Sequence, residues 1–308
     1  MKTPIVFLIF KRPEATEKVF DVIRSAKPEK LFVVADGARY DRANEAEQCE
    51  ITRAIVDRVD WDCEVFKNYS DVNLGCAKRV SSGLSWTFKQ VDRAIILEDD
   101  CIPDPSFFRF CEELLERYED DERICSISGQ NVQFGRRRTE NSYYFSRYQH
   151  CWGWATWRRA WQHFQFDRAV WERVKAEQLL KDILIDDRAV RVWHKIFEVT
   201  YSGEVDSWAS RWMLSCWLQN GLSILSNVNL ISNIGFDTDS TNTDDTVSPY
   251  NNMTRESLDF PLKHPSFMVR DNQADDFTQK TLYNYYPTLT EKIHKRFKKI
   301  AFWSSNLF

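Results

Sequence analysis

Apolar and polar positions along the first hundred residues alternate between two periods. Short continuous apolar runs, typical of strands covered on both faces, alternate with segments in which apolar residues recur every three or four positions, as in helices. The predicted strands are Pro4–Phe10, Leu31–Ala35, Cys63–Phe66 and Ala94–Leu97. The predicted helices begin at Pro13, cover residues 43–59 and extend from Cys76 to Phe88. This alternation predicts a mainly parallel sheet with helices on both faces.

The pattern changes after residue 100. Asp104 as N-cap and Pro105 at the first helical position predict another helix start. Further along we expect a strand, an aromatic segment, two helical regions and a polar loop, at residues 124–128, 143–164, 170–198, 207–219 and 237–252. There is no internal repeat and no Gly/Ser linker, so we expect the two halves to share one compact body.

Composition narrows the class of protein. The 308 residues are 43% hydrophobic, 29% charged and 14% aromatic, which excludes a disordered or fibrous chain. The formal net charge is −4, so no overall basicity indicates nucleic-acid binding. The eight cysteines include no C-x-x-C pair, which fits reduced thiols better than a zinc or disulfide framework. Neither a signal peptide nor a membrane span is indicated, so we expect a cytoplasmic protein.

Charged residues follow three predicted strands at their carboxyl ends. Arg12 follows the first strand, Asp36 the second, and the acidic triplet of Glu98, Asp99 and Asp100 the fourth. Ligands of parallel α/β sheets bind at that edge, so we expect these groups to converge. Adjacent carboxylates repel one another, and a divalent cation such as Mn²⁺ or Mg²⁺ relieves that repulsion. The alternative is a solvated acidic turn, because short acidic motifs are common.

The segment AIILEDDCIPDPSFFRF resembles the metal-binding segment of GT-A fold glycosyltransferases, most closely the N-acetylglucosaminyltransferase I type, whose motif is an E-D-D variant of D-x-D. Four further segments resemble that family in the same order: Phe10–Pro13, Val34–Gly37, Cys151–Ala155 and Gly203–Trp208. The resemblance covers residues 4–235. It implies an α/β fold of the GT-A type, with a mainly parallel, Rossmann-like sheet flanked by helices and an acceptor-side half fused to it.

The resemblance also implies roles for the residues at the strand ends. Asp100 would be the direct ligand of Mn²⁺ or Mg²⁺, while Glu98 and Asp99 would contact ribose or sugar hydroxyls. Arg12 and Asp36 would hold the nucleotide of a nucleotide-diphosphate sugar, with a uridine donor expected. The alternatives are a surface arginine before a proline-started helix and an aspartate in an Asp-Gly turn.

The tryptophan-rich segment has two interpretations. Trp152, Gly153 and Trp154 resemble the segment near the donor sugar, where a glycine permits close backbone approach and an indole covers an apolar sugar face. The alternative, usual for aromatic residues at helical spacing, is core packing. We expect both, with Trp152, Gly153 and Trp154 lining the site and Trp157 and Trp161 buried.

Transfer of a sugar to a hydroxyl needs a base that takes the acceptor proton. Asp206 matches the position of the family's catalytic base, and the resemblance implies inversion at the anomeric carbon. Glu204 is the nearest rival for the role. An aspartate just before a predicted helix is also a plausible N-cap of that helix, so this structural alternative stays open.

Residues 237–243 depart from the family pattern. Many GT-A enzymes place a late histidine near the metal, whereas Asn242 stands where it is expected here, and Asp239 is a candidate substitute ligand. Asp237–Thr241 also fits the D-x-D-x-T pattern of haloacid-dehalogenase-like phosphatases. Too little chain follows that segment for the α/β domain those enzymes need.

The expected organisation has three parts. Residues 1–100 form the nucleotide-sugar-binding half, residues 101–245 the acceptor and catalytic half, and residues 246–308 a C-terminal extension. Within that extension, residues 291–303 form a basic amphipathic segment that either rests on an anionic membrane or closes against the domain. We expect a metal-assisted transferase acting on a glycan or lipid-linked glycan acceptor. The alternative is a non-catalytic protein of the same fold that binds a nucleotide or glycan.

Overall fold

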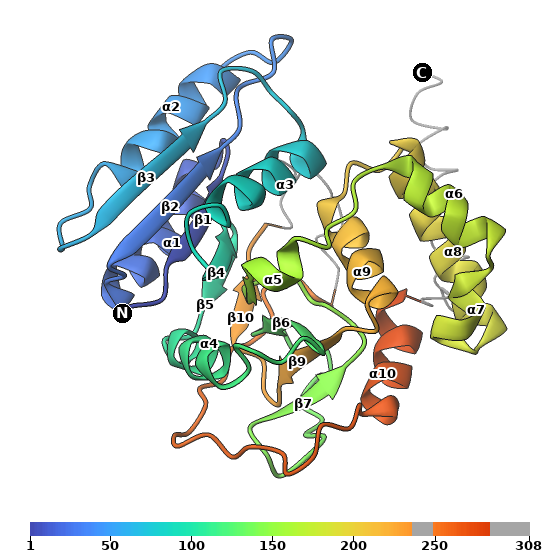
Figure 1. Cartoon of the computed structure of the whole chain (residues 1–308). Coiled ribbons are helices and arrows are strands. Elements are labelled where there is room, and N and C mark those ends of the chain that lie inside the picture. The colour runs from blue at the N-terminus through green and yellow to red at the C-terminus, as the bar shows by residue number, and fades with distance from the viewer. Residues whose placement is uncertain (236–248, 284–308) are drawn as a thin grey trace, which may run out of the picture.

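A mixed eight-stranded sheet crosses the whole molecule, of which the computed structural model describes residues 1–235 and 249–283 (Figure 1). Its strand order is β3-β2-β1-β4-β8-β6-β9-β7. The strands are β1 Ile5–Ile9, β2 Lys30–Ala35, β3 Glu64–Tyr69, β4 Arg93–Glu98, β6 Ile124–Ser128, β7 Tyr143–Ser146, β8 Trp154–Trp157 and β9 Leu222–Ser226. The first four strands are mutually parallel, as are β6 and β9, whereas β7 and β8 run antiparallel to their neighbours.

Helices cover both faces of the sheet, which confirms the predicted α/β class with a mainly parallel central sheet. The helices are α1 Pro13–Ala26, α2 Glu45–Val56, α3 Cys76–Thr87, α4 Ser106–Arg117, α5 Arg158–Trp161, α6 Arg168–Ala176, α7 Leu179–Leu184, α8 Asp187–Ser202, α9 Trp208–Leu218 and α10 Asn272–Thr278, followed by the π-helix η1 Gln279–Tyr283. Alternate residues of one strand enter different cores. In β1, Ile5 and Phe7 pack with α1, α2 and α4, whereas Val6 and Leu8 pack with α3 and α9.

A third core joins α6, α7 and α8 to α9, on the right of Figure 1. The helical spacing over residues 170–198 predicts this region, but it forms three helices. Gln178 and Ile185 have φ of 54° and 63° at the boundaries of α7. Such left-handed backbone ends a right-handed helix, so the chain turns twice and folds its aromatic residues together.

A second, two-stranded sheet was not predicted. Strand β5, Cys101–Pro103, directly follows the acidic triplet and pairs antiparallel with β10, Ile231–Asn233. The helix expected at Asp104 begins at Ser106 instead, with the Asp104 Oδ1 accepting the Ser106 N–H at 2.9 Å. The pairing of β5 with β10 holds residues 233–235 against the end of β4.

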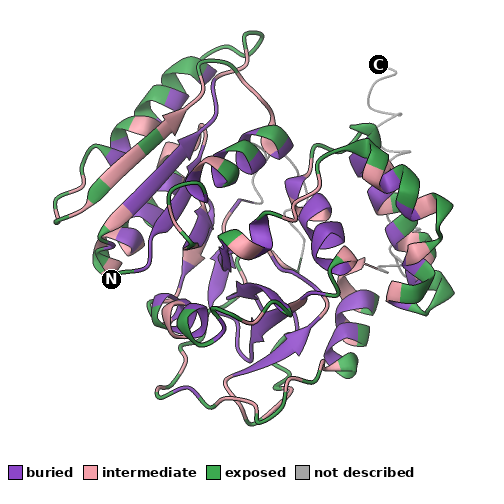
Figure 2. Cartoon of the chain, viewed as in Figure 1, coloured by how far each residue is buried: buried purple, intermediate pink, exposed green. Residues whose placement is uncertain are grey.

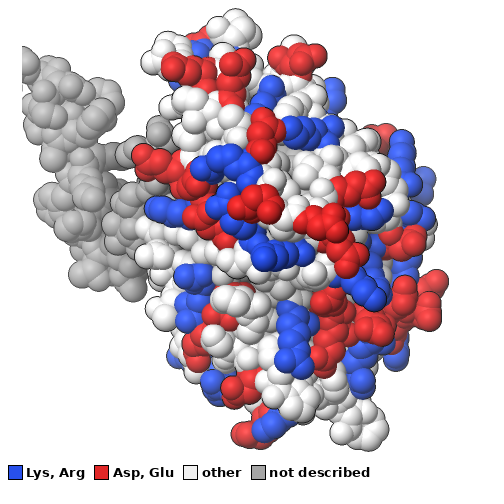
Figure 3. Space-filling model, turned by 90° about the vertical axis from the view of Figure 1, so that its left-hand side faces the viewer, with Lys and Arg blue, Asp and Glu red and all other residues white. Residues whose placement is uncertain are grey.

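Burial follows this architecture: the central strands are buried, while the outer faces of α2, α6, α7 and α8 are largely exposed (Figure 2). On the face seen in Figure 3, Lys and Arg mingle with Asp and Glu and form no single basic patch. Within the described ranges, none of the helices has the length and hydropathy needed to span a membrane. Asp239, Asn242, the segment Asp237–Thr241 and residues 291–303 lie outside the described residues.

Candidate active site

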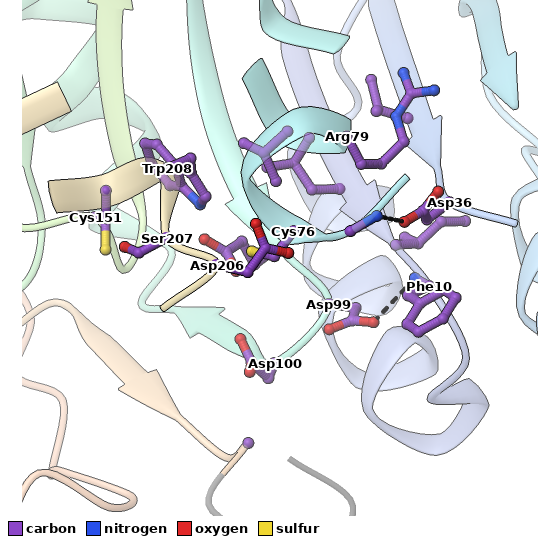
Figure 4. Close-up of a pocket in the computed structure, with 18 of the residues that line it drawn as sticks. Phe10, Asp36, Cys76, Arg79, Asp99, Asp100, Cys151, Asp206, Ser207 and Trp208 are labelled. Atoms are coloured by element: carbon purple, nitrogen blue, oxygen red, sulfur yellow. Dashed lines mark hydrogen bonds between the residues drawn. The ribbon is translucent and has the colours of Figure 1, made fainter. Parts of the chain in front are cut away.

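A cavity of about 420 Å³ opens at the carboxyl ends of β1, β2 and β4. The N-terminus of α3 and the segment leading into α9 form its other walls (Figure 4). It brings together seven of the residues singled out from the sequence: Arg12, Asp36, Glu98, Asp99, Asp100, Trp152 and Asp206. Their separation along the chain makes this convergence a result of the fold rather than of local sequence.

The acidic triplet is held by Arg12 at the end of β1. Arg12 Nη2 lies 2.7 Å from Asp99 Oδ1, and Nη1 lies 3.0 Å from Asp100 Oδ2. The Phe10 N–H donates to the second oxygen of Asp99 at 3.2 Å (Figure 4). Burial, with the adjacent charges of Asp100 and Asp99, raises the pKa of Glu98, and burial likewise raises the pKa of Asp99 against the opposing effect of Arg12. One guanidinium therefore faces three carboxyl groups.

This donor set fits a cation that is completed by substrate. In the part of the chain that the structure describes, no group of three or more His, Cys, Asp or Glu residues is placed to hold a metal ion. Mg²⁺ and Mn²⁺ usually take one or two carboxylates and complete their shells with phosphate and water. Asp100, supported by its two acidic neighbours, suits that arrangement and does not suit an all-protein cage.

Gly235 closes the cavity beside Asp100. A Cβ at this position would lie 2.0 Å from Asp100 Oδ2 and 2.7 Å from Arg12 Nη1. The Asn233 side-chain oxygen holds the Gly235 N–H at 2.8 Å. The β5–β10 pairing thus brings a bare stretch of backbone against the Arg12–Asp100 ion pair.

Asp36 is tied to the backbone of the loop before α3. Its carboxylate accepts N–H groups of Gly37 and Leu74 at 2.9 Å and of Gly75 at 3.1 Å. Burial raises the pKa of Asp36, and these backbone hydrogen bonds oppose the effect. The side chain lines the cavity and also fixes the loop that forms one of its walls.

We expect Asp36→Ala to lower the free energy of unfolding by about 1–3 kcal/mol, because three backbone N–H groups lose their acceptor. The family resemblance implies that Asp36 holds a nucleotide, so nucleotide affinity is also expected to fall. Urea unfolding and calorimetric titration with UDP would measure the two effects. The exposed Asp71 provides a matched control, and Asp71→Ala should change neither quantity. Equal stability of the two variants would contradict the bracing role.

Asp206 caps a helix, but not the one that follows it. Its Oδ1 accepts the Ala77 N–H at 3.0 Å at the start of α3, where the N-cap residue Gly75 has no side chain to offer. Helix α9 is capped by Ser207, whose hydroxyl accepts the Ser210 N–H. The interpretation of Asp206 as the N-cap of the following helix is therefore wrong. Its exposed carboxylate lines the cavity, whereas the rival Glu204 does not.

The aromatic segment is divided between cavity and core. Trp152 lines the cavity, and Trp157 and Trp161 are buried as expected. Trp154, expected near the donor sugar, is 1% exposed and outside the cavity lining, and its ring stacks on Trp208 at 5.4 Å. Trp154 belongs to β8, and its side chain packs in the core instead of lining the cavity.

Gly153 also departs from the expectation. It is buried, has φ of 61°, and a Cβ there would lie 2.3 Å from Ile231. The close approach that requires glycine is therefore to β10 and not to a sugar. Of the three residues expected near the donor sugar, only Trp152 lines the cavity.

Several cavity residues were not predicted from the sequence: Arg39, Asn73, Cys76, Arg79, Trp208 and Asn233. Arg79 lies one turn into α3, and its Nη2 donates to Asn68 Oδ1 at 2.6 Å. Trp208 opens α9, and its side-chain hydrogen bond lowers the pKa of Glu98 against the effect of burial. Their position in the chain could have indicated them, because both residues belong to the first turns of helices that begin at the cavity.

No family model and no curated protein matches this chain. Solved structures with partial likeness include HddC from Yersinia pseudotuberculosis, at 8% identity and a TM-score of 0.31, covering 51% of this chain and 77% of that one. The mannosyltransferase PcManGT from Pyrobaculum calidifontis, in complex with GDP-Man and Mn²⁺, has 11% identity and a TM-score of 0.36, with 70% of each chain covered. A UDP-glucose pyrophosphorylase complexed with UDP-glucose has 13% identity and a TM-score of 0.28, covering 47% of this chain and 62% of that one. TM-scores this low carry no functional argument.

Proposed function

We propose that the protein is a metal-assisted glycosyltransferase that moves a sugar from a nucleotide-diphosphate donor to an acceptor hydroxyl, with inversion. The observation that carries this proposal is the meeting of Arg12, the acidic triplet and the exposed carboxylate of Asp206 in one cavity. At about 420 Å³ the cavity falls within the range of small-molecule sites. The resemblance to the N-acetylglucosaminyltransferase I type of GT-A enzymes supports the same proposal.

Donor binding would divide the cavity into two ends. Arg12 stands at the N-cap of α1, so a diphosphate there would meet both a guanidinium and the positive end of a helix. The nucleobase would lie between the end of β2 and α3. Asp36, Asn73 and Arg79 line this part of the cavity. We propose that the nucleotide of the donor is uridine diphosphate. Trp152 would lie near the transferred sugar.

In the chemical step, the acceptor oxygen bonds to the anomeric carbon as the bond from that carbon to the diphosphate oxygen breaks. Asp206 takes the proton of the acceptor hydroxyl, and Arg12 holds the diphosphate. Mn²⁺ or Mg²⁺ held by Asp100, with Asp99 and Glu98 beside it, would supply charge neutralisation for the leaving diphosphate. The helix cap that Asp206 makes keeps its carboxylate oriented toward the cavity.

We propose that residues 1–100 are the nucleotide-sugar half, residues 101–245 the acceptor half, and residues 246–308 a C-terminal extension, whose segment 291–303 either rests on an anionic membrane or closes against the domain. The acceptor is a glycan or lipid-linked glycan, in polysaccharide synthesis on the cytoplasmic side. Asp239 and Asn242 are the candidates for a metal ligand beside Asp100.

A nucleotide-sugar panel tests the proposal. Thermal unfolding is measured with UDP-, GDP-, CDP- and ADP-sugars, each with and without Mn²⁺. We expect one nucleotide class to raise the midpoint, and Mn²⁺ to increase that shift. The stabilising donor is then incubated with protein and Mn²⁺, and released nucleoside diphosphate is measured with and without saccharide acceptors. Binding without any turnover would favour the non-catalytic alternative, and no shift with any donor would contradict both.

A further inference from the structure

We propose that Arg12 is an exchangeable partner of the metal site. In the free protein its guanidinium neutralises Asp99 and Asp100; on nucleotide binding it turns to the diphosphate and frees Asp100 for a divalent cation. The proposal rests on the proposed function and adds a regulation of the same site, because it makes metal binding depend on the nucleotide.

The first argument is the geometry of the guanidinium fork. Its two terminal nitrogens are divided between the two aspartates, with Nη2 at 2.7 Å from Asp99 and Nη1 at 3.0 Å from Asp100. The Asp99 and Asp100 side chains are only 4% and 11% exposed, while Arg12 is 25% exposed. The two carboxylates are thus fixed in the wall, and the arginine is the more accessible member of the group.

The second argument is that Arg12 and a cation need the same oxygen. Asp100 Oδ1 already accepts the thiol of Cys101 at 3.3 Å, while Oδ2 faces Arg12. The backbone of Gly235 closes the other side of Oδ2, since even a Cβ there would lie 2.0 Å away. A Mg²⁺ or Mn²⁺ ion binds about 2.1 Å from its oxygen ligand. An ion on Oδ2 would therefore adjoin the guanidinium, and the two positive charges repel.

The third argument is that a diphosphate competes with the two aspartates for the Arg12 guanidinium. Its fork geometry suits bidentate contact with phosphate as well as with carboxylate. Arg12 is also the N-cap of α1, so a diphosphate beside it gains the favourable end of the helix dipole. Once Arg12 has turned, three carboxyl groups and a diphosphate face one another, and a divalent cation between them relieves the repulsion.

This exchange couples two binding equilibria. Mn²⁺ should bind weakly to the free protein and at least about tenfold more tightly when a nucleoside diphosphate is bound. Linkage requires that Mn²⁺ strengthen nucleotide binding by the same factor. A rigid structural ion pair would instead leave Arg12 on the aspartates in every state.

The test measures Mn²⁺ binding by electron paramagnetic resonance, for the protein alone and with saturating UDP, GDP, CDP or ADP in turn. Arg12→Gln is compared with Arg24→Gln, which removes the same charge from the outer end of α1, where Arg24 pairs with Asp21 and Asp60. We expect Arg12→Gln to bind Mn²⁺ alone about tenfold more tightly than wild type, to bind nucleotide more weakly, and to lose part of the coupling. Arg24→Gln should match wild type in all three.

The outcomes separate the two proposals. If wild type binds none of UDP, GDP, CDP and ADP, with or without Mn²⁺, the proposed function fails and the exchange fails with it. If wild type couples nucleotide to Mn²⁺ but Arg12→Gln binds Mn²⁺ alone no more tightly, only the exchange is overturned. Circular dichroism checks folding, and Arg12→Lys serves if the glutamine variant unfolds. The lysine variant keeps one cation without the fork, so its free-protein Mn²⁺ affinity should rise less.

Discussion

Replacing Asp206 with asparagine is expected to lower the turnover of sugar transfer by about 10²-fold or more, with nucleotide affinity nearly unchanged. An amide cannot take the acceptor proton, but its oxygen can still accept the Ala77 N–H that Asp206 holds at 3.0 Å. The start of α3 should therefore keep its cap. Single-turnover transfer assays and calorimetric titration with the donor's nucleoside diphosphate would measure the two quantities.

Two further variants separate catalysis from capping. Glu204→Gln should leave turnover near wild type, because Glu204 is exposed, contacts Ser202 and does not line the cavity. Asp206→Ala removes both base and cap, so it should also lower the free energy of unfolding by about 0.5–2 kcal/mol. Near-normal turnover of the asparagine variant would remove Asp206 from the role of base and leave it only as the cap of α3.

The sheet could be predicted because each parallel strand is covered on both faces. Runs such as Leu31–Ala35 are continuously apolar, and Phe32 and Val33 indeed enter different cores. The helices between β1, β2, β3 and β4 are the crossover connections that parallel strands need. Because ligands of such sheets meet strand ends, the convergence of Arg12, Asp36 and the acidic triplet could also be predicted from the amino-acid sequence alone.

The rest depends on pairings between distant segments. Strand β5 has three residues and pairs with β10 about 130 positions later, so no local pattern reveals it. That pairing nevertheless brings Gly235 to Asp100. The cap that Asp206 makes on α3 could not be predicted for the same reason, since its partner Ala77 lies about 130 positions earlier in the chain.

The aromatic segment failed as a predictor because tryptophan suits both a sugar site and a core. Trp152 and Trp154 are two positions apart, and the left-handed backbone of Gly153 between them turns the chain as it enters β8. One indole lines the cavity and the other is buried against Trp208 and Trp212. The segment chosen by resemblance reaches the cavity through Trp152, and the local backbone decides which indole does so.

Asp100→Asn is expected to lower metal-dependent transfer by about 10²-fold or more. A bound divalent ion stabilises the leaving diphosphate by several kcal/mol, and each 1.36 kcal/mol corresponds to a factor of about ten in rate. The amide preserves the shape of the side chain but removes the charge that would hold the ion. Transfer rates over a Mn²⁺ series, with Mn²⁺ affinity measured in parallel, would test this.

The form of the loss identifies its cause. If Asp100 acts by holding the ion, a high Mn²⁺ concentration should partly restore the transfer rate of the asparagine variant. The Mn²⁺ concentration that gives half of the maximal rate should be higher for the variant than for wild type. Asp104→Asn is the matched control, because Asp104 contacts Ser106 at the start of α4 and lies outside the cavity lining. A variant at Asp100 that needs no more Mn²⁺ than wild type would contradict its role as ligand, since a lost carboxylate must weaken the ion's hold before it slows the chemistry.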